Sequence, residues 1–357
     1  MPSQPGRRVR AADVAAAAGV SPTAVSFVLN GRDGGNIAPE TRNRILKEAA
    51  RLGYEPHHVA RSLRSRTTHS LGLVTDAVAS SPFGGRLLAA ASERAEANGY
   101  IMLVMDLHSR EDREVSAIHE LERRQVDAII YVSMGFRVLD VAPKTRLPLV
   151  LANCTTGRDD ELSVYPDDAL GATRAIDHLA GLGHRRITML SGIWEPGSDR
   201  EDPGNISGPI RRDAFLKRAG ELGVEAAVLE SEWGIDDGYH AAMKVLDVPA
   251  EVRPTALFAV TDRAALGAML AAARLGLSVP EDLSLVGFDD EERLAERAVP
   301  PLTTIALPHV RMGDEAVAMA LAARAGEHIE DRRRCLPCEL LVRESTAPPA
   351  SVPTRTK

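Results

Sequence analysis

The residues from Asp13 to Gly31, DVAAAAGVSPTAVSFVLNG, constrain the fold more than any other part of the chain. Asp13 is suited to cap a first short helix, and Gly19 supplies the left-handed backbone conformation that often follows a helix end. Ser21 is suited to cap a second helix, with Pro22 at its first position, where a missing N–H costs nothing. Two short helices joined by a tight turn indicate a helix-turn-helix, a motif that places its second helix in the major groove of DNA.

The second predicted helix has an inner and an outer face. Val25, Val28 and Leu29 share one face, which we expect to pack inward. The other face is free to meet a major groove. The residues of this helix and its ends that we expect to contact DNA are Ser21, Pro22, Thr23, Ser26, Phe27 and Asn30. The alternative is an alanine-rich helical hairpin buried in a larger core.

The charge distribution favours DNA binding over a buried hairpin. Residues 1–66 contain 11 Lys and Arg against 5 Asp and Glu, a formal net charge of +6. The whole chain has a net charge of −7, so residues 67–357 have a net charge of −13. A basic head on an acidic body is expected when one segment neutralises phosphates and the rest stays in solution.

This head resembles the LacI/GalR family of transcriptional repressors. The matching residues are Asp13-Val14-Ala15, Ala18-Gly19-Val20-Ser21, Val25-Ser26, Val28-Leu29-Asn30-Gly31, Thr41-Arg42 and the ILKEAARLGYEP run. The resemblance implies a third helix from Pro39 to about Gly53, which closes a small core with Ile45, Leu46, Ala49 and Leu52. Phe27 stands where family members commonly have an arginine that reads guanine, so we expect a different operator half-site.

A basic segment, residues 54–69, follows the predicted head of residues 1–53. Val59, Ala60 and Leu63 match the family's hinge helix, which forms on DNA and pairs across a dimer so that a leucine enters the minor groove. The resemblance therefore adds His57, Val59, Ala60 and Leu63 to the expected DNA contacts, with Arg61, Arg64 and Arg66 near phosphates. The alternative for Leu63 is an ordinary linker leucine that packs on the body.

From Leu71 onward, apolar runs of strand length alternate with stretches of helical period. The runs are 71–74, 101–104, 128–132, 149–151, 187–190, 256–260 and 284–288, and helical stretches include 87–97, 170–182, 211–222 and 264–275. This alternation predicts α/β architecture with doubly wound parallel sheets, and the number of units favours two lobes.

The resemblance extends through this core and implies a periplasmic-binding-protein-like fold whose chain crosses between the lobes three times. The matching pieces are Gly183-His184-Arg185, the VPEDLSLVGFDD run, the PPLTTI run and Arg343-Glu344-Ser345. We expect crossovers near Asp168–Leu170, Leu302–Ile305 and Cys335–Pro337. The expected effector-binding core is 70–346, with lobe 1 at 70–168 and 306–334, lobe 2 at 169–303 and 337–346, and a disordered tail at 347–357.

Doubly wound sheets bind ligands beyond the carboxyl ends of their strands. Asp76, Thr261, Asp262 and Asp289 follow predicted strands, and Arg211 opens a helix behind a glycine-rich loop. Carboxylates and a guanidinium suit a polyhydroxylated ligand, so we expect a sugar. Phe83 and Trp233 are expected to line the same cleft.

The family match supports Arg211, which lies in an R-x-x-G-F slot, and Asp289, at an effector-binding aspartate position. Three positions depart from the family pattern: Ala214 replaces the glycine of that slot, Thr261 replaces an asparagine, and Gly84 replaces an aromatic residue.

Several of these residues have a structural alternative. Asp262 is suited to cap the helix after it, and Asp290 is expected to be structural for the same reason. Trp194 and Trp233 are alternatively core residues.

Three cysteines indicate no disulfide framework, and we expect no metal and no cofactor. Cys335-x-x-Cys338 has redox spacing but no second pair for zinc, and His184 is expected to be a packing residue. No signal peptide and no membrane-spanning run are seen, so a cytoplasmic location is expected.

The sequence thus predicts a homodimeric repressor that binds double-stranded DNA at an inverted repeat and a saccharide effector, without membrane contact. The alternatives are a solute-binding protein and an α/β enzyme of the same core fold. No dinucleotide glycine motif, phosphate loop or nucleophile elbow is seen, so we expect no enzyme.

Overall fold

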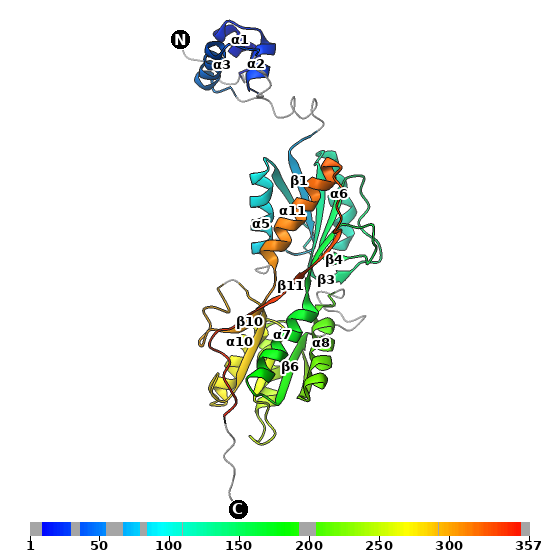
Figure 1. Ribbon diagram of the computed structural model, residues 1–357, viewed down its shortest axis with the longest axis vertical. Coiled ribbons are helices and arrows are strands. Elements are labelled where there is room, and N and C mark those ends of the chain that lie inside the picture. Colours follow the sequence, from blue (N-terminus) through cyan, green and yellow to red (C-terminus); the bar gives the residue numbers. More distant parts are fainter. Residues whose placement is uncertain are drawn as a thin grey trace, which may run out of the picture. The chain divides into compact units, whose positions relative to one another are not determined.

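In the computed structural model the chain forms two compact units, and the boundary between them in the sequence follows Thr68 (Figure 1). It describes residues 9–29, 36–54, 67–78, 84–108, 110–192, 205–291 and 293–350. The first unit contains a small group of helices, and the second contains two sheets with helices packed against them.

Three helices form the first unit: α1 (Ala11–Ala18), α2 (Pro22–Leu29) and α3 (Pro39–Leu52). Gly19 ends α1 with a φ of 63°, as the turn requires. Val14, Val25 and Ile45, one from each helix, are buried at the centre of this unit. The helix-turn-helix prediction is therefore confirmed.

Two details of the head differ from the prediction. Asp13 lies inside α1 at its third position, where its carboxylate accepts a 2.8 Å hydrogen bond from the Arg10 N–H. Leu46 is 42% exposed because it points away from the face of α3 that carries Ile45 and Ala49.

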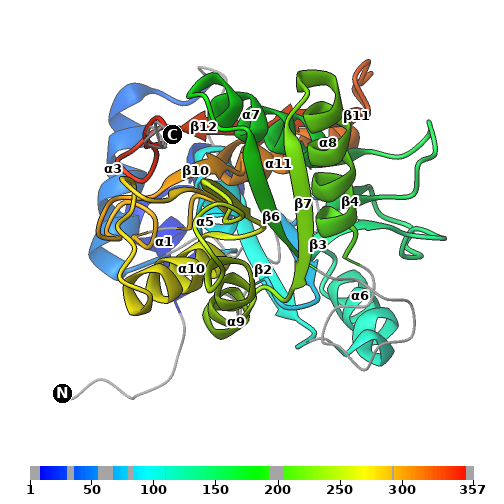
Figure 2. The ribbon, with the colours of Figure 1, turned by 90° about the horizontal axis from the view of Figure 1, so that it is seen from below.

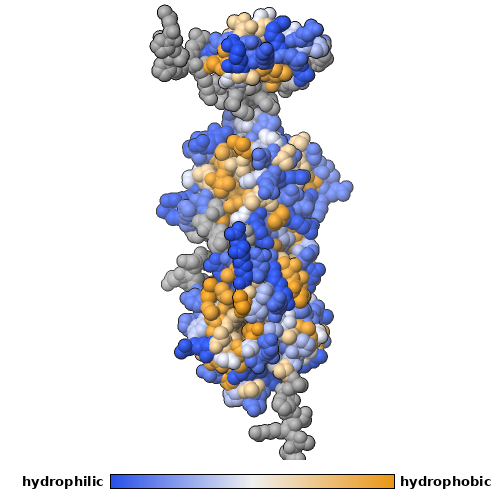
Figure 3. Space-filling view, turned by 90° about the vertical axis from the view of Figure 1, so that its left-hand side faces the viewer, coloured by the Kyte–Doolittle hydropathy of each residue, from blue (hydrophilic) through white to orange (hydrophobic). Residues whose placement is uncertain are grey.

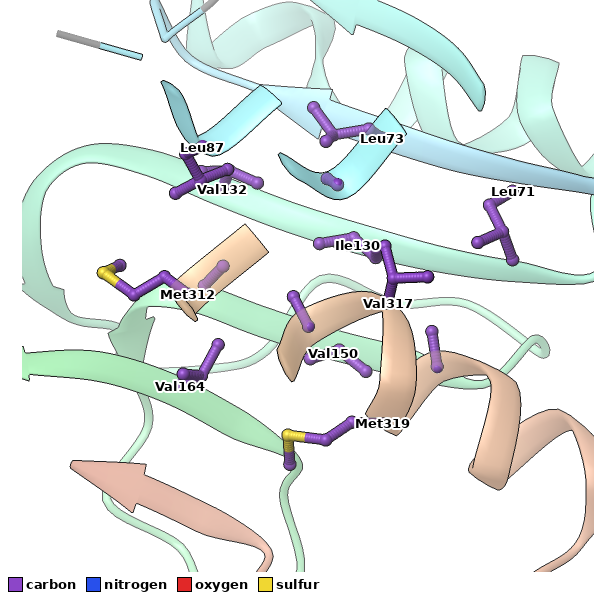
Figure 4. Packing of buried hydrophobic residues seen from close by; sticks show 14 of the residues in the cluster. Leu71, Leu73, Leu87, Ile130, Val132, Val150, Val164, Met312, Val317 and Met319 are labelled. Carbon is purple, nitrogen blue, oxygen red and sulfur yellow. The ribbon is translucent and has the colours of Figure 1, made fainter. Parts of the chain in front are cut away.

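The first sheet of the core has six parallel strands in the order β11-β5-β4-β3-β1-β2. The strands are β1 (Ser70–Thr75), β2 (Ile101–Asp106), β3 (Ala128–Val138), β4 (Leu149–Thr155), β5 (Ser163–Asp167) and β11 (Arg333–Pro337). One face packs on α5 (Gly85–Ala97) and α11 (His309–Ala325), where Leu87 and Met312 meet Ile130 and Val150 (Figure 4). The other face packs on α6 (Glu114–Arg123), which follows a short turn at Glu111–Arg113.

The second sheet has the order β12-β10-β9-β8-β6-β7, in which β12 alone is antiparallel to its neighbour. The strands are β6 (Arg186–Gly192), β7 (Glu225–Ser231), β8 (Ala256–Ala259), β9 (Ser284–Asp289), β10 (Thr303–Ala306) and β12 (Glu339–Leu341). Helices α7 (Asp168–Gly181) and α8 (Ser207–Leu222) cover one face, and α9 (Ile235–Leu246) and α10 (Asp262–Arg274) cover the other (Figure 2).

The chain passes between the two lobes three times, as the family resemblance implies. The first passage lies between β5 and α7, at Asp167–Asp168. The second lies at Leu307–Pro308, later than expected, because residues 303–306 still pair with β9. The third lies at Cys338, because residues 333–337 pair with β5 in the first sheet.

The C-terminal segment is ordered further than predicted. The Ala347 N–H donates to Ser284 Oγ at 2.9 Å, and the Ala347 carbonyl oxygen lies 2.9 Å from His184 Nε2. His184 is buried and its Nδ1 lies 2.9 Å from Thr255 Oγ1, so its packing role is confirmed. Ala347, the first residue of the predicted tail, is therefore hydrogen-bonded to the core. The structure describes the tail as far as residue 350, and residues 351–357 lie outside the described residues.

Candidate functional site

The outer face of α2 presents the side chains expected to meet DNA. The Ala24 N–H donates to Ser21 Oγ at 3.2 Å, so Ser21 caps the helix as predicted. Pro22 and Thr23 are exposed, and Phe27 is 46% exposed, while Val25 and Val28 are buried against α1 and α3. Phe27 therefore places an apolar ring on the face of α2 that would meet a groove.

Part of the predicted DNA contact set cannot be placed. Asn30, His57, Val59, Ala60 and Leu63 lie outside the described residues, as do Arg61, Arg64 and Arg66.

In the second unit, Arg211 is the centre of a buried ion cluster. It lies on α8, which begins four residues earlier than predicted, and it is only 3% exposed. Its Nε donates to Asp168 Oδ1 at 2.7 Å and its Nη1 donates to the Val260 carbonyl oxygen at 2.7 Å. Asp289 Oδ1 lies 3.6 Å from Nη1, and the guanidinium stacks 3.5 Å from the centre of the Phe288 ring.

This cluster lies where the lobes join. Asp168 begins α7 directly after the first passage, and His309 begins α11 directly after the second. Cys338, at the third passage, is buried close enough for Asp168 and Arg211 to affect its thiol. Arg211 is therefore surrounded by residues from the segments that connect the two lobes.

Burial controls the ionisation of this cluster. It raises the pKa of Asp289 well above its ordinary value, and it raises the pKa of Asp168 against the opposing effect of Arg211. Burial, helped by Arg86 and Arg211, lowers the pKa of His309 to about 4, so this imidazole is neutral at pH 7. Asp168 Oδ2 and His309 Nδ1 are buried atoms without a hydrogen-bond partner within the described chain.

Asp76 lies in the other lobe, just beyond β1. Its Oδ1 accepts hydrogen bonds from the N–H groups of Ala77, at 2.6 Å, and Met134, at 2.9 Å. Its Oδ2 lies 3.5 Å from Arg137 Nη2. Burial raises the pKa of Asp76. The pairing with Arg137 was not foreseen because the sequence places Arg137 beyond the apolar run, whereas β3 continues to Val138.

Thr261 and Asp262, both expected at the ligand, are instead engaged within the protein. Thr261 Oγ1 caps α10 by accepting from the Ala264 N–H at 3.0 Å, and it donates to the Trp233 carbonyl oxygen at 2.9 Å. Asp262 is fully buried, and its oxygens accept from Thr304 and from the Glu291 N–H. The cap is therefore Thr261, and Asp262 links the start of α10 to β10 and to the segment that follows β9.

Of the aromatic residues considered for the cleft, the structure describes only Trp233. Trp233 is half-buried, and its ring occupies the space over Gly192, where an added β-carbon would lie 2.6 Å from the ring. A β-carbon at Gly84 would lie 2.1 Å from the Val78 side chain, so the aromatic residue common in the family does not fit there. Phe83 and Trp194 lie outside the described residues.

A contact between the lobes was also not foreseen. Arg86, on α5, places Nη1 3.2 Å from Asp290 Oδ2, and its Nη2 donates to the carbonyl oxygens of Asp289, at 3.3 Å, and Asp290. Arg343 Nη2 donates to Asp290 Oδ1 at 2.7 Å. Asp290 is thus structural, as expected, but as an ion-pair partner and not as a helix cap.

Cys338 is buried and Cys335 is exposed on β11. Among the described residues, no group of three or more His, Cys, Asp and Glu side chains is arranged to hold a metal ion. Across the same ranges no single helix is long and apolar enough to span a membrane, and α1 with α2 meets that test only as a pair bent by 103°.

Comparison with known proteins identifies both units. A family model described as bacterial regulatory proteins, lacI family, matches residues 12–57, and one described as a periplasmic binding protein-like domain matches residues 176–346. The chain is 33% identical over 344 residues to the HTH-type transcriptional regulator DegA of Bacillus subtilis (strain 168). The aligned residues cover 94% of this chain and 97% of DegA.

Two solved structures extend the likeness. The lac repressor dimer bound to operator and the anti-inducer ONPF has a TM-score of 0.79 and 27% identity, covering 96% of this chain and 100% of that chain. The transcriptional regulator CelR in complex with cellobiose has a TM-score of 0.66 and 26% identity, covering 95% of this chain and 100% of that chain. The chain therefore belongs to the lacI family of bacterial regulatory proteins, as a DNA-binding transcriptional regulator with a helix-turn-helix head and a periplasmic-binding-protein-like core.

Proposed function

We propose that this regulator is a repressor that binds an inverted-repeat operator as a homodimer, and that a hydroxyl-rich effector, a sugar, changes its operator affinity. The observation that carries the DNA proposal is α2, capped by Ser21 with Val25 and Val28 inward and Phe27 outward. The net charge of +6 on residues 1–66 supports phosphate contact. Because its relatives are transcriptional regulators, we infer that it acts in the cytoplasm and is not an enzyme.

The effector proposal rests on the Arg211 cluster. Arg211 offers a fork of donors, while Asp289 offers acceptors at the carboxyl end of β9, so together they match neighbouring hydroxyl groups. Asp76 supplies a second carboxylate from the other lobe. The lac repressor and CelR structures named above, which contain ONPF and cellobiose, support a carbohydrate-like ligand for this chain.

The dimer proposal is supported by exposed apolar side chains on both lobes. β2 is an edge strand whose side chains are at most half-buried, and Ile101 and Val104 are exposed. Leu270 on α10 is also exposed. One face of the molecule shows apolar patches over each lobe (Figure 3), as expected of a surface covered by a second copy.

The test begins with selection of an operator from a random DNA library by the full chain. Calorimetric titration with a sugar panel then finds a ligand, and a gel shift measures operator binding with and without it. Arg211→Ala is expected to abolish ligand binding and the response, while operator affinity without ligand stays nearly unchanged. A variant that still binds and still responds would place the effector site elsewhere.

A further inference from the structure

A pocket lies on lobe 1 beside β4, where the connections between the strands contain no helix. Residues 139–148 join β3 to β4, residues 156–162 join β4 to β5, and the structure describes both segments as loops. A connection between parallel strands commonly has roughly a dozen residues or more and contains a helix. In place of such helices, these two loops and β4 line a cavity of about 570 Å³.

The walls of this pocket are largely apolar. Leu149 and Leu151 on β4, Leu162 before β5 and Ala323 on α11 supply apolar side chains to it. Sites for small molecules have volumes on the order of 300–1,000 Å³ and are mostly apolar, with a few polar groups that orient the ligand. The pocket therefore has the size and the lining of a site for a small molecule with an apolar body.

Arg332, which also lines the pocket, has an unused hydrogen-bond donor. Its Nη2 donates to the Asp160 carbonyl oxygen at 2.6 Å, but its Nε is buried and has no hydrogen-bond partner within the described chain. Its guanidinium forms no ion pair with a carboxylate of the described residues. A buried N–H of a charged group without an acceptor is costly, and an oxygen atom of a ligand would satisfy it.

Two of the acidic residues that line the pocket are already paired with other arginines. Arg158 donates from Nε to Asp160 Oδ1 at 3.1 Å and from Nη2 to Oδ2 at 3.5 Å. Glu161 accepts hydrogen bonds from three hydroxyl groups of its neighbours, and its Oε1 lies 3.9 Å from Arg333 Nε. These carboxylates therefore do not balance the charge of the remaining arginine of the pocket, Arg332.

The third acidic residue, Asp140, is exposed, so water screens its charge. We propose that the pocket binds a small carboxylic acid with an apolar body, either aliphatic or aromatic, and that Arg332 donates hydrogen bonds to its carboxylate. Leu149, Leu162 and Ala323 contact the apolar body. This is a second ligand site, because none of the residues that line it belongs to the proposed effector site.

The test begins with calorimetric titration of the full chain at pH 7.5. The probes are octanoate and 4-phenylbutyrate, each compared with its neutral amide, octanamide or 4-phenylbutanamide. We expect at least one acid to bind, and its amide to bind more weakly by about tenfold or more, because the amide has the same apolar body but no charge for Arg332. The acid that binds more tightly shows whether the pocket prefers an aliphatic or an aromatic body. If neither acid binds at millimolar concentration, or if each amide binds as tightly as its acid, the proposal is overturned.

A pair of arginine variants tests the contact with the carboxylate. Arg332→Gln should weaken binding of the acid by about tenfold or more and leave the weaker binding of the amide nearly unchanged. Arg334→Gln is the matched control, because Arg334 lies two residues further along but is ion-paired with Glu315 and does not line the pocket. Equal losses of acid binding in the two variants would contradict the role of Arg332.

A third variant tests the pocket itself and does not depend on Arg332→Gln being folded. Ala142, which lines the pocket from the loop between β3 and β4, is partly exposed, so a larger side chain can enter the cavity there. Ala142→Trp should weaken binding of the acid and of the amide alike, and binding as tight as in the parent would overturn the proposal. Binding that is lost in Arg211→Ala but kept in Ala142→Trp would place the acid in the effector site instead.

Discussion

The contact between Arg86 and Asp290 predicts a measurable effect on the opening of the two lobes. Arg86 reaches from α5 to the Asp290 carboxylate and to two carbonyl oxygens, those of Asp289 and Asp290. Both of these aspartates have positive φ, 102° and 51°, a region that aspartate tolerates only at a cost. The segment that carries Asp289, which we propose contacts the effector, is therefore held directly by the other lobe.

The size of the effect follows from burial. Hydrogen bonds to charged groups contribute about 1.5–3 kcal/mol when buried and exposed ion pairs about 0–1 kcal/mol. The Arg86 and Asp290 side chains are 29% and 17% exposed, between these limits. We expect Arg86→Gln to destabilise the arrangement of the lobes seen in this structure by about 1–2 kcal/mol, a change of roughly 5–30-fold in the balance between this arrangement and one in which the contact is broken.

The assay is a distance measurement between spin labels on exposed positions of each lobe, Glu96 on α5 and Lys244 on α9, in a background with Cys335→Ser. Arg86→Gln should broaden and lengthen the distance distribution. Arg94→Gln is the matched control, because Arg94 also lies on α5 but pairs with Asp314 inside the same lobe, at 3.6 Å. Identical distributions for Arg86→Gln and the parent would refute the coupling between the lobes.

Three further predictions concern the head. Phe27→Arg should shift the selected half-site toward guanine at one position, because arginine donates two hydrogen bonds to guanine and phenylalanine none; an unchanged consensus would make Phe27 a packing residue. Leu63→Ala should weaken operator binding while sparing salt-sensitive binding to random DNA, and equal operator affinity in a gel shift would exclude a wedge role. Ile45→Ala, at a fully buried position, should destabilise the head by about 2–5 kcal/mol, whereas Leu46→Ala, at an exposed one, should change it by at most about 0.5 kcal/mol; thermal unfolding of both, monitored through the head, distinguishes them.

Most of the strands that the sequence predicted lie inside a sheet, where helices cover both faces and the side chains must be apolar. Continuous apolar runs identified β1, β3, β4, β6, β8 and β9, which lie inside the sheets. Five strands had no such run. β7, β11 and β12 are edge strands, where one side of the strand is open and polar residues are tolerated. β5 and β10 lie inside their sheets, but they are only 5 and 4 residues long and contain polar residues. β2 is also an edge strand but is apolar, which is consistent with its proposed place in a dimer interface.

The candidate site was predicted only in part, because residue type and strand position identify the edge of the sheet where a ligand binds but not the partners that meet there. Arg211 and Asp289 do lie together. Asp168 and His309 were missed because each begins a helix directly after a passage between the lobes. Arg86 was missed because it reaches the Asp289 carbonyl oxygen from α5, about 200 positions away in the chain. Thr261 and Asp262 follow a strand as expected, but the start of α10 uses their polar atoms.

Selection of DNA by the full chain tests the central claim most directly. A library with a long random region, followed by sequencing of the bound fraction, should return an inverted repeat whose two halves are related by dimer symmetry. Binding to that repeat should weaken steeply with salt and fall sharply when one half is scrambled. A chain that enriches no sequence, or binds the scrambled site as tightly as the repeat, would contradict the assignment of this protein as an operator-binding regulator.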